Sequence, residues 1–183
     1  MHPPTLCRID KMVDMINIEI TTTDVLGLLP PYPIVLVTTR TNVITVNQVA
    51  YFTFSPLRIG VAIAHIRHTY GLLVDEQEFV VNIPGAHLVE VVKQCGTLSG
   101  RDGDKFVKAG LTRVPAAVVD AVRVAECGAF IECRVDQMLE FENRTWFIAQ
   151  VVAASLRMGH EGTEALMCGR HDYRIPGAVI ASR

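Results

Sequence analysis

The sequence predicts a mainly β protein whose strands form a closed or nearly closed antiparallel barrel, with a few short helices between them. Runs of β-branched residues separated by turn signals follow one another through most of the chain. In the later runs apolar and polar residues alternate, as in antiparallel strands with one buried face. Several strands with a few short helices between them suggest such a barrel.

The chain of 183 residues fits one domain, with an expected core of about residues 25–160 and an extension at each end. Half of its residues are hydrophobic and the mean hydropathy is +0.30. Such a surplus can be buried in a subunit interface, so a homodimer is expected. A dense monomeric core is the alternative.

The charge pattern and the apolar runs exclude several classes of partner. Seventeen basic and nineteen acidic residues give a net charge of -2 without a basic stripe, so nucleic acid is not an expected partner. Apolar runs end well before the roughly 18 residues of a membrane span, and residues 1–14 lack the core of a secretory signal. A cytoplasmic protein without a membrane partner is expected.

Cysteine and motif patterns indicate neither disulfides nor metal. The five cysteines are odd in number and form no C-x-x-C pair. Cys95 lies on an apolar helix face and Cys133 in an alternating strand, so both are interpreted as packed thiols rather than nucleophiles. The histidines form no H-x-x-x-H or H-E-x-x-H, and G-x-G-x-x-G is absent, so neither a metal site nor a Rossmann half is predicted.

The first predicted strands follow a proline-rich segment. Residues 29–33 contain three prolines and are expected to be extended. Residues 34–40 are rich in β-branched side chains and predict a strand. Asn42 offers a turn, and residues 43–54 form a second extended stretch that completes a hairpin.

A third strand over residues 58–65 places small side chains on one side: Gly60, Ala62 and Ala64. That side could lie against a flat group or another backbone. A short helix over 69–76 follows, with Thr69 as its expected N-cap.

The middle of the chain alternates strands and helices. Residues 78–83 predict a strand, and residues 87–94 give the clearest helix, whose apolar positions follow i, i+3, i+4, i+7 spacing: Leu88, Val91, Val92 and Cys95. Residues 99–103 read as a loop and 104–109 as a short helical piece.

Two long strands end the predicted core. Residues 129–139 alternate, with one apolar side (Ile131, Cys133, Val135) and one side expected to be solvated (Glu132, Arg134, Asp136). Residues 145–158 form the longer strand after a turn at Asn143-Arg144.

Arg67, His68 and Thr69 stand at the start of a predicted helix and form a candidate anion site. A helix N-terminus presents free N–H groups and the positive end of the dipole, and a hydroxyl and a guanidinium would complete a phosphate site. On these residues alone the commoner alternative is a solvated loop in which Thr69 only caps the helix.

The segment from Ser99 to Lys105 is a second anion candidate. Its two glycines allow the backbone to fold into a nest, and two cations are available. By itself, the pattern is more often an exposed turn.

A third candidate is the side of an extended chain that Thr45, Asn47, Thr53 and Ser55 share. Val49 and Tyr51 make this face amphiphilic, so it could hydrogen-bond a heteroaromatic ring while keeping it largely dry. A solvent-facing strand side is an equal alternative.

Taken in order, several segments resemble the flavin reductase-like, FMN-binding split-barrel family. They are Pro33–Thr39, Asn47, Arg58–Ile63, His68–Tyr70 and Glu78–Pro84. Ser99–Arg101, Asp104–Phe106 and Ala109–Thr112 further resemble its flavoredoxin and ferric-reductase branch. The resemblance spans roughly residues 30–155 and depends on order and spacing rather than on one motif.

This resemblance implies an FMN-binding split β-barrel of Greek-key type, dimeric, with FMN near the subunit interface. The flavin ring would lie beside the stretch Thr45 to Ser55, which includes Phe54. The phosphate would lie near Arg67, His68 and Thr69, with Ser99 and Lys105 close by. With this resemblance, a phosphate site is preferred over a solvated loop for Arg67 to Thr69, and over an exposed turn for Ser99 to Lys105.

The sequence departs from the family pattern in three places. Members usually have a proline pair where this chain has only Pro56. Free-flavin reductases often have Asp-His where this chain has Asn143-Arg144, and a glycine is usual at the position of Ala149.

The leading hypothesis is an FMN oxidoreductase with NADH or NADPH as co-substrate and a small-molecule or protein electron acceptor. A prosthetic-FMN electron carrier without NAD(P)H turnover is one alternative. The other is a split-barrel binding or sensing protein that holds haem or no cofactor.

Overall fold

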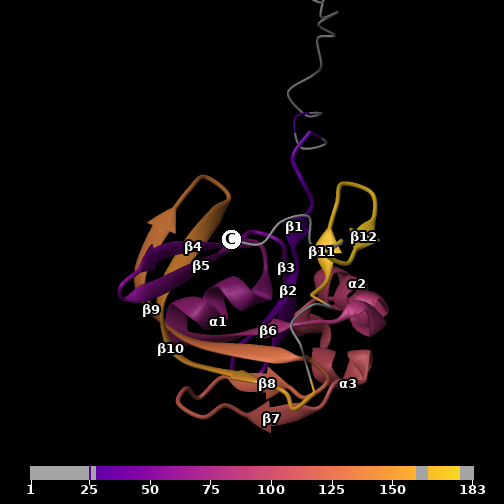
Figure 1. Ribbon diagram of the computed structural model, residues 1–183. Coiled ribbons are helices and arrows are strands. Elements are labelled where there is room, and N and C mark those ends of the chain that lie inside the picture. Colours follow the sequence, from indigo (N-terminus) through magenta and orange to yellow (C-terminus); the bar gives the residue numbers. More distant parts are fainter. Residues whose placement is uncertain (1–24, 26–27, 160–164, 178–183) are drawn as a thin grey trace, which may run out of the picture.

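The computed structural model describes residue 25, residues 28–159 and residues 165–177, and its main feature is a seven-stranded sheet (Figure 1). Its strands are β2 (Val35–Thr38), β3 (Val43–Val46), β4 (Val49–Phe54), β5 (Leu57–Ala64), β6 (Glu78–Ile83), β9 (Ala129–Glu140) and β10 (Arg144–Leu156). All neighbouring strands in this sheet are antiparallel. The predicted mainly β class is therefore confirmed.

The order of the strands closes the sheet into a barrel. That order is β3-β2-β6-β9-β10-β5-β4, so β3 and β4 are its two edges. Only Asn47 and Gln48 separate these edges along the chain, and the Gln48 carbonyl accepts a hydrogen bond from the Ala62 N–H at 3.0 Å. The two edges must therefore lie next to each other.

This closure corrects the prediction of one extended stretch over residues 43–54. β3 pairs with β2 in the expected hairpin, whereas β4 pairs with β5 in a second hairpin. The extended stretch has to be interrupted at Asn47-Gln48, because there the chain leaves one edge of the sheet and enters the other.

Two small sheets accompany the barrel. One contains β1 (Tyr32–Pro33), β11 (Met167–Cys168) and β12 (Tyr173–Arg174), and the other contains β7 (Arg113–Pro115) and β8 (Val122–Val124). In Figure 1 they lie at opposite ends of the molecule, β11 and β12 at the upper right and β7 and β8 at the bottom.

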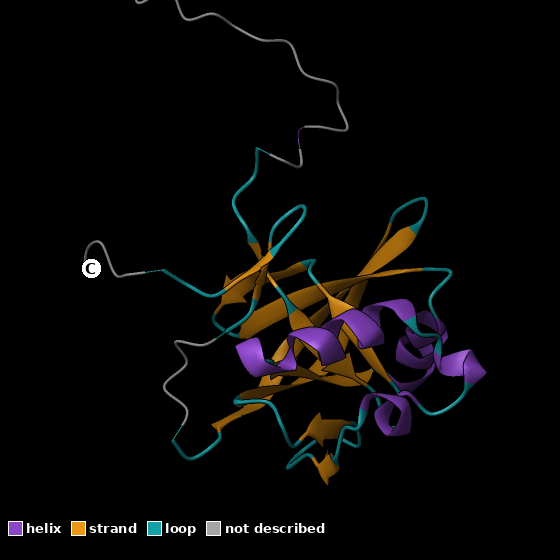
Figure 2. Ribbon diagram, turned by 90° about the vertical axis from the view of Figure 1, so that its right-hand side faces the viewer, coloured by secondary structure: helices purple, strands orange, loops and turns teal. Residues whose placement is uncertain are grey.

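The helices are short, as predicted. They are α1 (His68–Glu76), α2 (Val89–Thr97) and α3 (Lys105–Ala109), with 3₁₀ turns η2 (Ala86–Leu88) and η3 (Gly100–Asp102). Figure 2 turns the side that carries α2 and α3 toward the viewer. None of the helices in the described residues has the length and apolarity to cross a membrane.

Two buried clusters lie on the two faces of the barrel wall. Successive residues of β2 point to opposite faces, so Val35 and Val37 join the barrel interior while Leu36 joins the cluster beneath α2 and α3. Because both faces of β2 are covered, all four of its residues are buried and three apolar residues follow one another, Val35, Leu36 and Val37.

The side of β5 with small residues packs against an aromatic ring. A Cβ on Gly60 would lie 2.5 Å from Cε2 of Phe52 and 3.1 Å from Cε3 of Trp146. The flat group predicted against this side is therefore the Phe52 ring of the neighbouring strand, which meets Trp146 edge to face with 5.7 Å between centroids.

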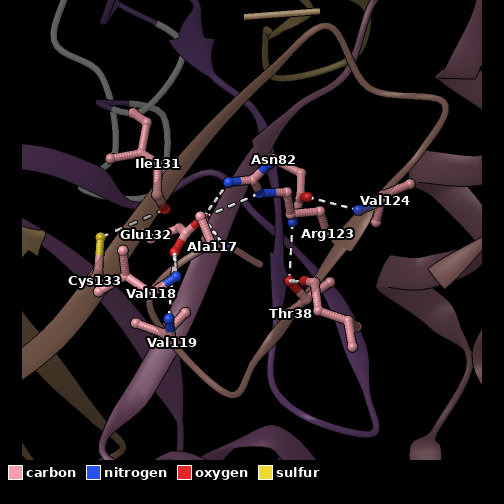
Figure 3. Close-up of polar contacts among 11 residues, drawn as sticks. Thr38, Asn82, Ala117, Val118, Val119, Arg123, Val124, Ile131, Glu132 and Cys133 are labelled. Carbon is pink, nitrogen blue, oxygen red and sulfur yellow. Dashed lines mark hydrogen bonds and ion pairs between the residues drawn. The ribbon is translucent and has the colours of Figure 1, made fainter. Parts of the chain in front are cut away.

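The prediction that the Glu132 side of β9 is solvated is wrong at Glu132, which is 0% exposed. Its carboxylate accepts hydrogen bonds from the N–H groups of Ala117 at 2.8 Å and Val118 at 2.7 Å, and it also pairs with Arg123 (Figure 3). Glu132 thereby fastens the segment between β7 and β8 to the barrel. Arg134, farther along the same side, is exposed as expected.

Candidate functional site

A cavity of about 250 Å³ lies where the start of α1, the η3 turn and the start of α3 meet. It is lined by Asn42, Ile44, Ile66, Arg67, His68, Thr69, Leu98, Ser99, Gly100, Arg101 and Lys105. Two arginines, one lysine and one histidine are among these side chains, and none is a carboxylate. Both predicted anion segments are thus brought to one cavity, which we call the basic pocket.

The first segment begins α1 and contributes Arg67, His68 and Thr69. Arg67 is the N-cap residue and makes no side-chain capping bond, so the prediction that Thr69 caps the helix is wrong. Thr69 instead lies in the first turn, 1% exposed, and its Oγ1 accepts a hydrogen bond from Nδ2 of Asn42 at 2.9 Å. Because the oxygen accepts, the hydroxyl hydrogen can donate to a ligand.

The second segment forms the η3 turn and packs closely on the first. A Cβ on Gly100 would lie 2.5 Å from Oδ1 of Asn42 and 2.7 Å from Cδ2 of His68, so this close approach requires glycine. Arg101 Nη1 donates to the Ile66 carbonyl at 3.0 Å. Ser99 Oγ accepts from the Arg101 N–H at 3.2 Å, which leaves its hydroxyl hydrogen available as a donor.

Lys105 supplies a buried positive charge to the basic pocket. It is 2% exposed, and its Nζ donates to the Cys95 carbonyl at 2.6 Å. Burial lowers the pKa of Lys105 to about 8, and the nearby Arg67 acts in the same direction. An ammonium group in this setting gains strongly from a bound anion.

A second cavity of about 410 Å³ adjoins the basic pocket and shares Asn42, His68, Gly100 and Lys105 with it. Its one carboxylate, Asp104, caps α3 and pairs with Arg113 at 2.6 Å. Together the two cavities offer a volume in the usual range for organic ligands, roughly 300–1,000 Å³.

The residues predicted to bind a flavin ring lie elsewhere. Thr45 Oγ1 donates to the Val92 carbonyl of α2 at 2.5 Å, and Asn47 lines a separate cavity. Thr53 and Ser55 are exposed near the β4–β5 turn, with Phe54 78% exposed between them.

The prediction that Thr45, Asn47, Thr53 and Ser55 share one amphiphilic face is therefore wrong. The strand is interrupted at residues 47–48 and the register shifts between Tyr51 and Thr53, so the odd-numbered residues do not all point to the same side. Their roles as flavin ligands stay predictions.

Asn42 lines the basic pocket and was not a predicted site residue, whereas Arg101 belongs to the predicted segment Ser99 to Lys105. Asn42 was interpreted only as a turn residue, and its partner Thr69 is 27 residues later in the chain. A local pattern carries no signal of such a contact.

The thiols of Cys95 and Cys133 are buried, and burial raises the pKa of both. Their prediction as packed thiols is confirmed by this burial. Cys7 lies outside the described residues.

Sequence comparison adds a family assignment. The model of the flavin reductase like domain family matches residues 29–176. An uncharacterized protein of Archaeoglobus fulgidus is 38% identical over 121 residues, 66% of this chain and 68% of that protein. A Pyrococcus abyssi protein is 33% identical over 61% of this chain; the match spans 64% of its length, less than two thirds.

Solved structures share the fold. A flavoredoxin from Methanosarcina acetivorans has a TM-score of 0.81 at 21% identity, covering 91% of this chain and 94% of that one. A split barrel domain protein from Shewanella frigidimarina has a TM-score of 0.80 at 16% identity, covering 90% and 93%. An FMN-binding protein from Thermus thermophilus has a TM-score of 0.76 at 20% identity, covering 85% and 93%.

Proposed function

This chain belongs to the flavin reductase like domain family, and on that premise we propose that it is an FMN-binding oxidoreductase. The observation that carries the proposal is the basic pocket, where three cations and the start of a nine-residue helix meet without a carboxylate. A phosphate monoester is the group whose charge and acceptor oxygens match such a donor set. A structural neighbour is named as an FMN-binding protein, which supports FMN as the molecule that carries this phosphate.

In this proposal each pocket residue has a separate task. The Arg67 guanidinium and the Lys105 ammonium neutralise the phosphate, while the hydroxyl groups of Thr69 and Ser99 donate hydrogen bonds to it. Gly100 keeps the two segments close enough to act together. When bound, FMN would supply the hydride or electron transfer.

A direct test is to titrate the purified protein with FMN and follow the visible absorption spectrum. We expect flavin bands that shift on binding, and a markedly weaker affinity in the double variant Arg67→Ala, Lys105→Ala. Unchanged affinity in the variant would overturn the phosphate assignment, and a spectrum identical to free FMN in both proteins would overturn the cofactor.

The same sample distinguishes two roles of the flavin. The proposed reductase would lose its flavin bands on addition of NADH or NADPH. A prosthetic-FMN carrier, as the resemblance to flavoredoxins suggests, would lose them only with dithionite or a protein donor. A haem-binding or cofactor-free barrel would bind no FMN.

We also propose that the protein acts as a homodimer. Several large apolar side chains on β4, on β9 and just after β9 are exposed: Tyr51, Phe52, Phe54, Met138, Leu139 and Phe141. Burial of such a surface would stabilise a dimer. A molecular mass of one chain by light scattering, at micromolar concentration, would contradict this.

A further inference from the structure

A cavity of about 400 Å³, separate from the basic pocket, lies at the break between β3 and β4. It is bounded by Asn47 and Gln48 at the break, by Arg144 at the start of β10, and by Tyr32 and Arg170 from the side of the small sheet. We call it the Arg144 cavity.

Arg144 brings a positive charge to this cavity, and the hydrogen bonds of its guanidinium within the described residues go to neutral amides. Its Nε donates to Oδ1 of Asn143 at 2.9 Å and its Nη1 donates to Oε1 of Gln48. In the described part of the chain no carboxylate pairs with Arg144, and none lines the cavity. The two amides hold the guanidinium plane in place and leave its Nη2 group to bind an acceptor.

The rest of the lining suits an organic body rather than a bare ion. The phenol ring of Tyr32 and the half-buried Cys168 contribute apolar surface, and Arg170 adds a second guanidinium. A fixed arginine beside an apolar wall favours a ligand with an acidic group on an aromatic or aliphatic frame.

The position of the cavity relates it to the basic pocket. Ile44 lines the basic pocket and Asn47 lines the Arg144 cavity, and three residues of extended chain span about 10 Å. A molecule in the Arg144 cavity would therefore lie within reach of an organic ligand anchored by its phosphate at the other end of β3.

We propose that the Arg144 cavity binds the acidic group of a small organic acid, the substrate that exchanges electrons with the flavin. The assignment of the ligand as an electron-exchange substrate rests on the proposed function. The binding of an organic acid to Arg144 does not, because it can be measured on the protein without FMN.

The test compares 2-naphthoate with 2-naphthamide, which share one ring system but differ in charge. Both would be titrated into the FMN-free protein by calorimetry. We expect the acid to bind at least about tenfold more tightly than the amide, as for a charge-assisted hydrogen bond. The difference should vanish in Arg144→Gln and persist in part in Arg144→Lys. The control Arg134→Gln removes an equal charge from an exposed arginine outside the cavity, and the difference in affinity between acid and amide should remain.

The location of the bound acid has its own reporter. Trp146 is the only tryptophan of the chain, and it lies two residues from Arg144 on the same side of β10. Its indole N–H signal in the NMR spectrum should shift with the acid in the wild type and not in Arg144→Gln.

Three results would overturn the proposal: equal affinity for acid and amide, a preference that survives Arg144→Gln, or a preference that Arg67→Gln abolishes while Arg144→Gln does not. The last result would assign the acid to the basic pocket. If the acid binds as expected but FMN does not, the proposed function fails and the anion site remains.

Discussion

Lys105 and Glu132 are both buried ionisable residues, but their surroundings differ. The Glu132 carboxylate accepts hydrogen bonds from the N–H groups of residues 117–119 and pairs with Arg123. Within the described residues the Lys105 ammonium has one hydrogen bond, to the Cys95 carbonyl, and it faces two cavities. A buried charge whose partners all come from the chain stabilises the fold, whereas one with spare donors beside a cavity is available to a ligand.

The pKa values of the two groups express the same difference. Burial alone would raise the pKa of Glu132, but the N–H groups and the Arg123 guanidinium outweigh it and hold that pKa below its ordinary value. For Lys105 burial dominates and lowers the pKa to about 8. The protein compensates the charge of Glu132 and leaves that of Lys105 for an anion to compensate.

The largest expected effect is on stability, from Glu132→Gln. The amide keeps one acceptor oxygen, so its NH₂ group would face N–H donors in place of the other oxygen, and Arg123 would lose its anionic partner. We expect the free energy of unfolding in urea to fall by about 3–5 kcal/mol.

Glu78→Gln is the matched control for this variant. Glu78 accepts from the Asp120 N–H of the same segment and pairs with Arg134, but its side chain is 22% exposed. A loss below about 1 kcal/mol is expected there. Equal losses in the two variants would contradict the distinction between a buried anchor and a surface ion pair.

The next effect is on binding, from Lys105→Met. Removing a cation that bonds phosphate should weaken FMN binding by roughly 10–100-fold. The unfolding free energy should stay level or rise, since a buried, poorly partnered charge has gone. Calorimetric titration and urea unfolding measure the two quantities.

Lys108→Met provides the comparison, because Lys108 is exposed and bonds the Asp102 carbonyl outside both cavities. It should leave FMN affinity unchanged. A stability loss in Lys105→Met as large as that in Glu132→Gln would show that Lys105 is a structural anchor instead.

The last effect is the dependence on pH. Lys105 titrates near pH 8 when folded, against an ordinary value of 10.5, so between these values the unfolded chain binds more protons. The stability of the FMN-free protein therefore rises with pH in this window, at most by about 1.4 kcal/mol per pH unit.

FMN affinity should fall over the same range, as the ammonium loses its charge. Both trends are measured as differences between the wild type and Lys105→Met at pH 7.5 and 9.5. Identical pH profiles for the two proteins would assign the dependence to another group.

Elements with strong local patterns were predictable from the sequence. The spacing of Leu88, Val91, Val92 and Cys95 predicted the apolar face of a helix. Val92 and Cys95 are buried and Val91 is half-buried on α2, while Leu88 is buried in the η2 turn just before it. β6 has the predicted bounds, residues 78–83, because a β-branched run ends at Pro84-Gly85. The anion segments around Arg67 and Ser99 were likewise visible as residue types that suit a phosphate.

Other features required the tertiary structure. The alternation that placed Glu132 on a solvated side was sound for an isolated strand, but residues 117–119 cover that side. The break at Asn47-Gln48 follows from closure of a barrel whose edges are consecutive strands. The meeting of Arg67, Ser99 and Lys105 depends on Gly100 packing against Asn42 and His68.

The sequence by itself determined most strands of the main sheet, the short helices and the chemical types available for a phosphate site, because these depend on neighbours a few residues apart. Only the tertiary structure decided which charges are compensated, which side chains share a cavity and where the chain breaks between β3 and β4. Those outcomes depend on packing between segments that lie tens of residues apart, and burial then sets whether a charge is compensated by the chain or left for a ligand.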